Sequence, residues 1–131
     1  MKSTGKLLYG VQVGDTIHYE YTVTMPVIRH TVNALATTME ALGETASPAA
    51  SMYYRAAIMA ECMLSLGTLA GDDITADIIL DGMTDEDFDL IDAEFAGLKK
   101  KRINGSQDSP DSAALPSPSD SMASAPITSG T

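Results

Sequence analysis

The sequence is poor in aromatic residues, in cysteine and in long apolar runs. Only 5% of its 131 residues are aromatic and none is Trp. A small domain with so few aromatic residues should have marginal stability unless a partner contributes to its core. The single cysteine, Cys62, cannot form a disulfide within the chain, which favours a reducing compartment. No apolar run approaches the roughly 18 residues that a membrane-spanning helix needs.

Basic residues are scarce as well. Residues 1–98 hold fifteen acids against four bases, and the formal net charge of the chain is -10. Such a surface repels the phosphates of nucleic acid. The N-terminal MKSTGKLLYG has no long apolar stretch behind its charge, unlike a signal peptide. These absences predict an acidic cytosolic protein without nucleic-acid or membrane partners.

Groups that could support catalysis or metal binding are also few. Neither His18 nor His30 has a Cys, Asp or Glu at metal-ligand spacing, so both are expected to be ordinary solvated side chains. Cys62 lies in an apolar segment, which is typical of an inert buried thiol and not of a nucleophile. The acids of DGMTDEDFD resemble a calcium loop but lack its Gly at position 6 and Glu at position 12. We therefore expect that the protein is not an enzyme and that it has no cofactor or metal site.

The N-terminal region predicts a β-hairpin. KLLYGVQVGDTIHYEYTVTMP contains two strand-like runs around the turn residues Gly14 and Asp15. In the second run, apolar side chains alternate with polar ones: Ile17, Tyr19, Tyr21 and Val23 against His18, Glu20, Thr22 and Thr24. An isolated hairpin is marginal in water, so helices should cover its apolar face.

The middle of the chain predicts two apolar helices. Residues 27–43 carry an apolar stripe in steps of four and three residues, which consists of Ile28, Val32, Leu35, Met39 and Leu42. Gly43 is a natural end for this helix. Residues 49–67 are apolar nearly all round, which indicates a buried helix or one that offers a second face to a partner. The short run at residues 74–80 fits a strand or a helical turn equally well.

Residues 83–102, MTDEDFDLIDAEFAGLKKKR, predict an amphipathic helix of about five turns that closes the folded part. Thr84 is a suitable N-cap with Asp87 three residues on. The acids at the start and the bases at the end match the helix dipole. The apolar face consists of Phe88, Ile91, Phe95 and Leu98, and the acids between residues 85 and 94 are expected to form a solvated face.

The C-terminal region has a different composition. Residues 103–131 contain eight Ser and four Pro among 29 residues, too little apolar area to offset the entropy of ordering. The sequence therefore predicts an α+β domain at residues 1–102, a hairpin packed on about three helices, and a disordered Ser/Pro/Ala-rich tail at residues 103–131.

Methionines in or near the apolar segments suggest a partner-binding surface. Thioethers adapt to irregular partners, although ordinary core filling explains them too. The expected surface is the exposed part of the apolar helices, around Met52, Tyr53, Met59 and Met63, with Phe88 and Phe95 in the core. Acidic, Met-rich character is also compatible with homo-oligomers.

The order of these elements resembles the tail assembly chaperones of bacteriophages, in particular the Mu-like contractile-tail (myophage) family. That family has a β-hairpin and then a proline before a helix, here MPVIRHTVNAL. A helix ending in Leu-Gly-x-Leu follows, here residues 66–69, and a Leu-Thr-x-Glu-Asp helix start comes last, here MTDED at residues 83–87. The resemblance covers roughly residues 7–102, and the Ser/Pro tail is not part of the family pattern.

This resemblance implies a function. Such chaperones bind the tape measure protein in the host bacterial cytoplasm, keep it soluble, help to recruit tail tube subunits and are absent from the mature virion. The alternatives are a structural or tail-completion protein of the virion and a small regulatory binding protein. Related phages also make a longer product by programmed frameshift, for which Lys99, Lys100 and Lys101 suggest an A-rich slippery site.

Overall fold

The structure is a computed structural model that describes residues 1–107. The chain divides into a compact unit, Met1–Lys99, and a second unit, Lys100–Thr131. The elements are β1 (Lys2–Val13), β2 (Thr16–Thr24), α1 (Ile28–Leu42), α2 (Pro48–Cys62), β3 (Met63–Leu66), β4 (Leu69–Ala70), the 3-10 turn η1 (Gly71–Asp73), α3 (Ala76–Gly82) and α4 (Asp85–Gln107). The expected α+β class with an N-terminal hairpin is confirmed. Most of the ambiguous run at residues 74–80 is helical, because α3 begins at Ala76; the domain therefore has four α-helices in place of about three.

The sheet has four antiparallel strands in the order β1-β2-β3-β4. The expectation of one helix over residues 49–67 is wrong at its end, because α2 stops at Cys62 and the next four residues form β3. Leu66 pairs with Tyr21 of β2, and the backbone N–H of Gly67 donates to the carbonyl of Glu20 at 2.6 Å. Pairing with an existing strand therefore outweighs the helical pattern of this segment.

Strand β1 bends sharply at a bulge. Lys6 pairs with Glu20 and Val11 with His18, so four β1 residues lie opposite one β2 residue. Gly10 has a φ of 81° at this bend, and a Cβ there would lie 2.6 Å from Cγ2 of Ile17. The bend thus depends on a residue without a side chain.

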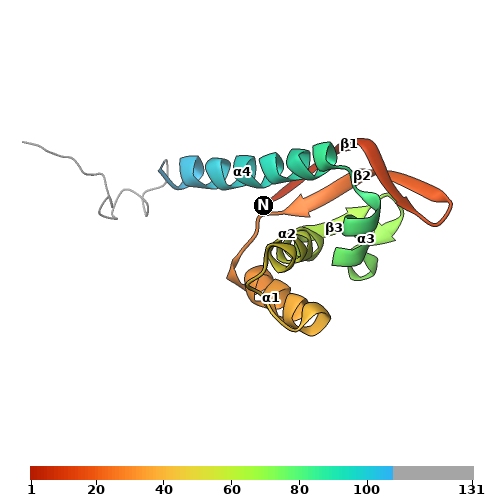
Figure 1. The fold of residues 1–131 in the computed structure, drawn as a ribbon. Helices are drawn as coiled ribbons and strands as arrows, with labels where there is room; N and C mark the ends of the chain where they lie inside the picture. Colours follow the sequence, from red (N-terminus) through yellow and green to blue (C-terminus); the bar gives the residue numbers. More distant parts are fainter. Residues whose placement is uncertain (108–131) are drawn as a thin grey trace, which may run out of the picture. The chain divides into compact units, whose positions relative to one another are not determined.

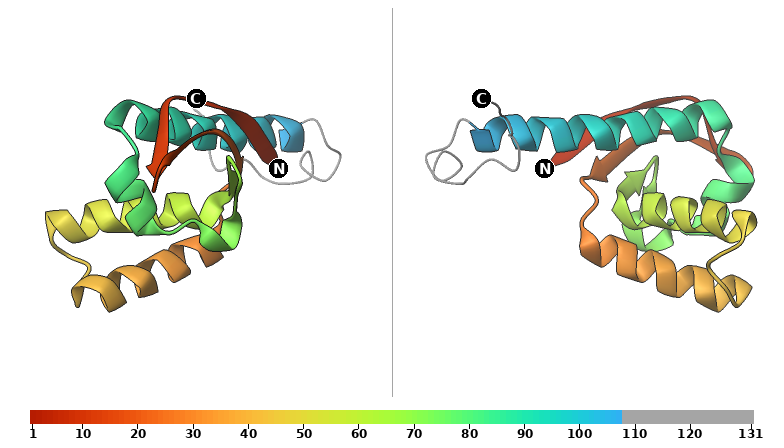
Figure 2. Two further views of the ribbon diagram at one scale, coloured as in Figure 1. Left: turned by 90° about the vertical axis from the view of Figure 1, so that its right-hand side faces the viewer. Right: turned by 60° about the vertical axis from the view of Figure 1, so that its left-hand side comes forward.

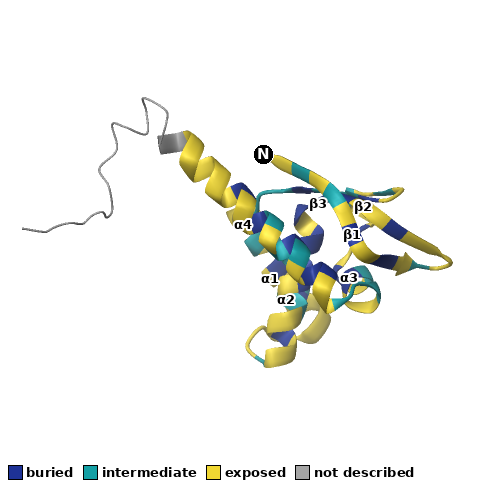
Figure 3. Ribbon diagram, turned by 90° about the horizontal axis from the view of Figure 1, so that it is seen from above, coloured by how far each residue is buried: buried dark blue, intermediate teal, exposed yellow. Residues whose placement is uncertain are grey.

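Helices cover the sheet in layers. Figures 1 and 2 show α2 between α1 and the strands, so that α1 is the outer layer. In Figure 3 the buried segments gather where the helices meet the strands. One core cluster joins the strands with α1, α2, α3 and α4; its fully buried large side chains are Val11, Val23, Met59, Met63, Leu66 and Ile91.

The N-cap and the apolar face expected for helix α4 are confirmed. The N–H of Asp87 donates to the Thr84 hydroxyl at 3.2 Å, the N-cap bond. All four residues of its apolar stripe are buried: Phe88, Ile91, Phe95 and Leu98. The Arg55 guanidinium of α2 lies 4.9 Å from the centre of the Phe88 ring and binds Asp92 at 2.7 Å. These contacts hold α4 to α2 as well as to the sheet.

The C-terminal boundary is later than expected. Helix α4 continues to Gln107, past the expected end at Arg102, so the expectation that the disordered tail begins at residue 103 is wrong for residues 103–107. The remainder of the expected tail, residues 108–131, lies outside the described residues.

Candidate partner-binding surface

Helix α1 presents large apolar side chains to solvent. Its five-residue stripe, called the α1 stripe below, is exposed along its whole length: Ile28 (78%), Val32 (46%), Leu35 (41%), Met39 (50%) and Leu42 (43%). A large contiguous apolar patch on the surface of a soluble protein often marks an interaction site. The α1 stripe is therefore the strongest candidate for a functional surface.

The sequence of α1 explains why these residues point outward. The helix packs mainly on α2, and its buried residues are the small Ala34 and Thr38. The Thr38 hydroxyl donates to the carbonyl of Ala34 at 2.8 Å, so its polar group is satisfied within the helix. Small side chains at the contact let two helices approach closely. The large residues of the stripe lie beside this contact, and each of them is at least 41% exposed.

Both ends of α1 are capped, so the stripe is presented on a well-defined helix. Nδ1 of His30 accepts the backbone N–H of Val27 at 2.9 Å, so this partly exposed histidine also caps the helix. Gly43 ends the helix with a φ of 77° and donates its N–H to the carbonyl of Met39 at 2.8 Å. Asn33 also donates to Glu61 of α2 at 2.9 Å.

The spacing and charge of the α1 stripe determine what it can bind. Steps of four, three, four and three residues are those of a heptad seam, which packs against the side chains of another helix. Arg29 and Glu40 are the only residues of α1 with a full charge, and both are exposed. The surface is apolar and nearly neutral, and it offers no nucleophile or acid–base pair. It is suited to packing against another helix.

The expected binding residues are only partly at the surface. Met52 is 41% exposed, and Tyr53 is partly buried against the core. The expectation that Met59 and Met63 are exposed is wrong, since each is only 1% exposed. Met59 lies on the buried face of α2, and Met63 belongs to strand β3.

The expected core position of Phe88 and Phe95 is confirmed, with 8% and 7% exposure. Of the two apolar helices on which the sequence placed the candidate surface, α1 is the one whose apolar stripe is exposed along its length. Its signal was the stripe itself, which the sequence identified without indicating that it faces outward.

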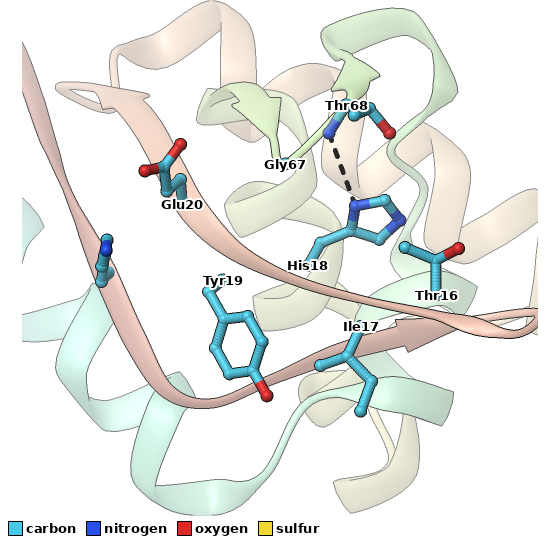
Figure 4. Close-up of a pocket in the computed structure, with 8 residues that line it drawn as sticks. Thr16, Ile17, His18, Tyr19, Glu20, Gly67 and Thr68 are labelled. Carbon is cyan, nitrogen blue, oxygen red and sulfur yellow. Dashed lines mark hydrogen bonds between the residues drawn. The ribbon is translucent and has the colours of Figure 1, made fainter.

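A second candidate is an open hollow of about 460 Å³ beside the β3–β4 turn. Figure 4 shows its lining residues: Lys6, Thr16, Ile17, His18, Tyr19, Glu20, Gly67 and Thr68. The solvated role expected for His18 is wrong, because the residue is only 6% exposed. Its Nδ1 accepts the N–H of Thr68 at 3.4 Å, and a Cβ on Gly67 would overlap its ring. The imidazole therefore packs against the β3–β4 turn and hydrogen-bonds its backbone.

Asp87, like His18 and Thr38, is a buried polar residue, and the sequence did not indicate its burial. Its side chain is fully buried, which contradicts the expected solvated acidic face at this position. The carboxylate accepts three consecutive backbone N–H groups of the β1 bulge, from Leu8 at 2.6 Å, Tyr9 at 2.9 Å and Gly10 at 3.0 Å. These three hydrogen bonds anchor the β1 bulge to the start of α4.

The remaining predicted residues do not form a reactive site. Cys62 is fully buried, and burial raises the pKa of its thiol to about 12. The burial that the sequence predicted for Cys62 is confirmed, and burial favours the neutral thiol over the nucleophilic thiolate. Lys99, Lys100 and Lys101 are exposed on α4, and the frameshift proposed there is a property of the gene that stays a prediction. Within residues 1–107, no three His, Cys, Asp or Glu side chains gather closely enough to hold a metal ion.

In the described part of the chain, no helix is both long and apolar enough to cross a bilayer.

Comparisons with known proteins add no assignment to these observations. No protein-family model, curated protein or solved structure matches the chain.

Proposed function

We propose that this protein is a non-enzymatic assembly chaperone that holds an amphipathic helix of its client on the α1 stripe. The observation that carries the proposal is that all five large residues of the stripe are exposed on a capped helix. A helix laid on such a face contributes its own apolar residues at every third or fourth position. Burial of apolar side chains from both helices then drives association.

The resemblance of residues 7–102 to phage tail assembly chaperones suggests the client. A tape measure protein is a long helical chain with apolar faces, which matches the occupant that the α1 stripe requires. Recruitment of tail tube subunits and action in the host bacterial cytoplasm belong to the same proposal.

The distribution of charge is compatible with this role. Most acids of the folded unit lie outside α1, on the turn η1 and on helices α3 and α4. Net negative charge keeps a protein and its complexes dispersed by mutual repulsion. A neutral binding helix on an acidic body can thus cover an apolar client and keep it soluble.

The test is co-expression of the full chain with the tape measure protein of the same genome, followed by size-exclusion chromatography. We expect the client to be insoluble alone and to co-elute with the wild-type chain. Leu35→Glu should abolish the complex because it places a charge in the centre of the stripe.

The matched control is Leu80→Glu on α3, because Leu80 and Leu35 are each 41% exposed. This variant should retain the client. A client that is equally soluble with and without the chaperone, or a complex that survives Leu35→Glu, contradicts the proposal. Detection of the chain in purified virions would favour a structural tail protein.

A further inference from the structure

We propose that copies of this chain associate head to tail, with four basic residues of α4 in one copy against an acidic surface of the next. The four bases, called the basic turn below, are Lys99, Lys100, Lys101 and Arg102. The acidic surface consists of the exposed acids of η1, α3 and the start of α4, all within residues 72–89. This contact does not use the α1 stripe, so it is separate from client binding.

The fold makes no use of the basic turn. All four bases are exposed, and the last buried residue described on α4 is Leu98. Helix α4 continues to Gln107, so its last turn holds no base, and the expected match of these bases with the helix dipole is wrong. Within residues 1–107 the one ion pair joins Arg55 to Asp92, and it does not involve the basic turn.

Helix geometry also leaves the basic turn without a partner on α4 itself. Side chains three or four residues apart are neighbours on a helix, and no acid lies at either spacing from any of the four bases. Lys99 and Arg102 are three residues apart and repel each other. The charge of the basic turn is therefore not compensated among the described residues, and a negatively charged partner surface would compensate it.

Residues 72–89 have the opposite imbalance. They hold eight acids and no base, and all of these acids except Asp87 are exposed. Asp85 and Asp89 are four residues apart on α4, where like charges repel. No ion pair within the described part of the chain involves any of these acids. The chain thus contains two uncompensated surfaces of opposite sign, each complementary in charge to the other surface on a second copy.

A second copy fits the basic turn better than a nucleic acid does. Residues 1–98 carry fifteen acids against four bases, and this excess repels the phosphates of a nucleic acid. The same excess attracts the basic turn of another copy. Exposed ion pairs are weak singly and are screened by salt, so the association should be weak and should depend on ionic strength.

The contact is heterologous, because the two surfaces are different parts of the chain. A copy bound through its basic turn still offers its acidic surface, so association continues as an open chain unless it closes into a ring. Each copy contributes one α1 stripe. If the proposed client function holds, an assembly therefore offers several binding helices to one long client.

The first experiment is sedimentation velocity of the nuclease-treated full chain over a range of protein concentrations. At about 0.01 M salt, where the Debye length is about 30 Å, the average sedimentation coefficient should rise with concentration. At about 1 M salt, where the Debye length is about 3 Å, the chain should be monomeric.

Charge reversal tests the basic turn. The double variant of Lys100→Glu and Lys101→Glu should raise the apparent dissociation constant about tenfold or more, because it places acids against acids. The matched control is the double variant of Lys2→Glu and Lys6→Glu, which makes the same change in net charge at two exposed lysines of β1. This control should keep most of the association. Circular dichroism verifies that all variants are folded.

A charge swap tests the contact itself. The double variant of Asp81→Lys and Asp89→Lys changes the net charge from -10 to -6, because each substitution adds two positive charges. Lower net charge by itself would favour association, whereas loss of the acidic surface should weaken it. A mixture of this variant with the variant reversed at Lys100 and Lys101 should associate again, because opposite charges then meet at one contact.

Four results would overturn the inference. These are a monomer at every concentration in low salt, an association that persists at the higher salt, a control that loses as much association as the reversed basic turn, and a mixture that associates no better than its components. If untreated protein associates but nuclease-treated protein does not, a nucleic acid and not a second copy occupies the basic turn. None of these results bears on client capture, which the co-expression experiment measures independently.

Discussion

Helices α1 and α4 carry the same kind of apolar stripe and use it in opposite ways. The four residues of the α4 stripe are at most 8% exposed, whereas those of the α1 stripe are 41% to 78% exposed. Both stripes repeat in steps of three and four residues. Periodicity therefore indicates that a helix has an apolar side, but it does not determine whether that side meets the core or a partner.

The difference arises from what the rest of each helix contributes. Helix α4 supplies, beside its stripe, the buried carboxylate of Asp87 that binds the β1 bulge, so its stripe is held against the sheet. Helix α1 meets α2 through Ala34 and Thr38 and needs no large residue for that contact. The α4 stripe is thus part of the fold, and the α1 stripe is available for binding.

The largest effect on stability should come from the α4 stripe. Phe95→Ala removes a buried ring and leaves a cavity, so we expect the free energy of unfolding to fall by about 4 kcal/mol. Urea denaturation followed by circular dichroism measures this loss. A change below about 1 kcal/mol would mean that α4 does not pack on the core as described.

A somewhat smaller loss is expected at Asp87. Asp87→Ala leaves three buried or partly buried N–H groups without their acceptor, and we expect a loss of about 3 kcal/mol in the free energy of unfolding. Hydrogen exchange of the amides of residues 8–10 should accelerate as well. Asp89→Ala, at an exposed neighbour on the same helix, is the control and should change stability by less than about 0.5 kcal/mol. Equal effects of the two substitutions would refute the anchoring role of Asp87.

The smallest effect should come from the α1 stripe. Leu35→Ala should change the free energy of unfolding by less than about 1 kcal/mol, because Leu35 is 41% exposed and outside the core cluster. The same denaturation experiment measures this change. A loss of 2 kcal/mol or more would place Leu35 in the core and remove the contrast between the two helices.

Local features of the sequence predicted the element types well. The hairpin turn at Gly14, the stop at Gly43 and the N-cap at Thr84 each depend on residues within one turn of each other, so short-range rules identify them. The stripes of α1 and α4 followed from spacing alone. The α+β class was evident from these elements before any tertiary contact was known.

The sequence by itself thus determined the N-terminal hairpin, helix α1, most of helix α2 and the start of helix α4. Only the tertiary structure decided three further points: that residues 63–66 leave helix α2 to pair with β2, that Asp87 and His18 are buried, and that the α1 stripe faces solvent. Each depends on contacts between segments far apart in the chain. Local spacing carries no information about such contacts, because the same stripe has the same periodicity whether it faces the core or solvent.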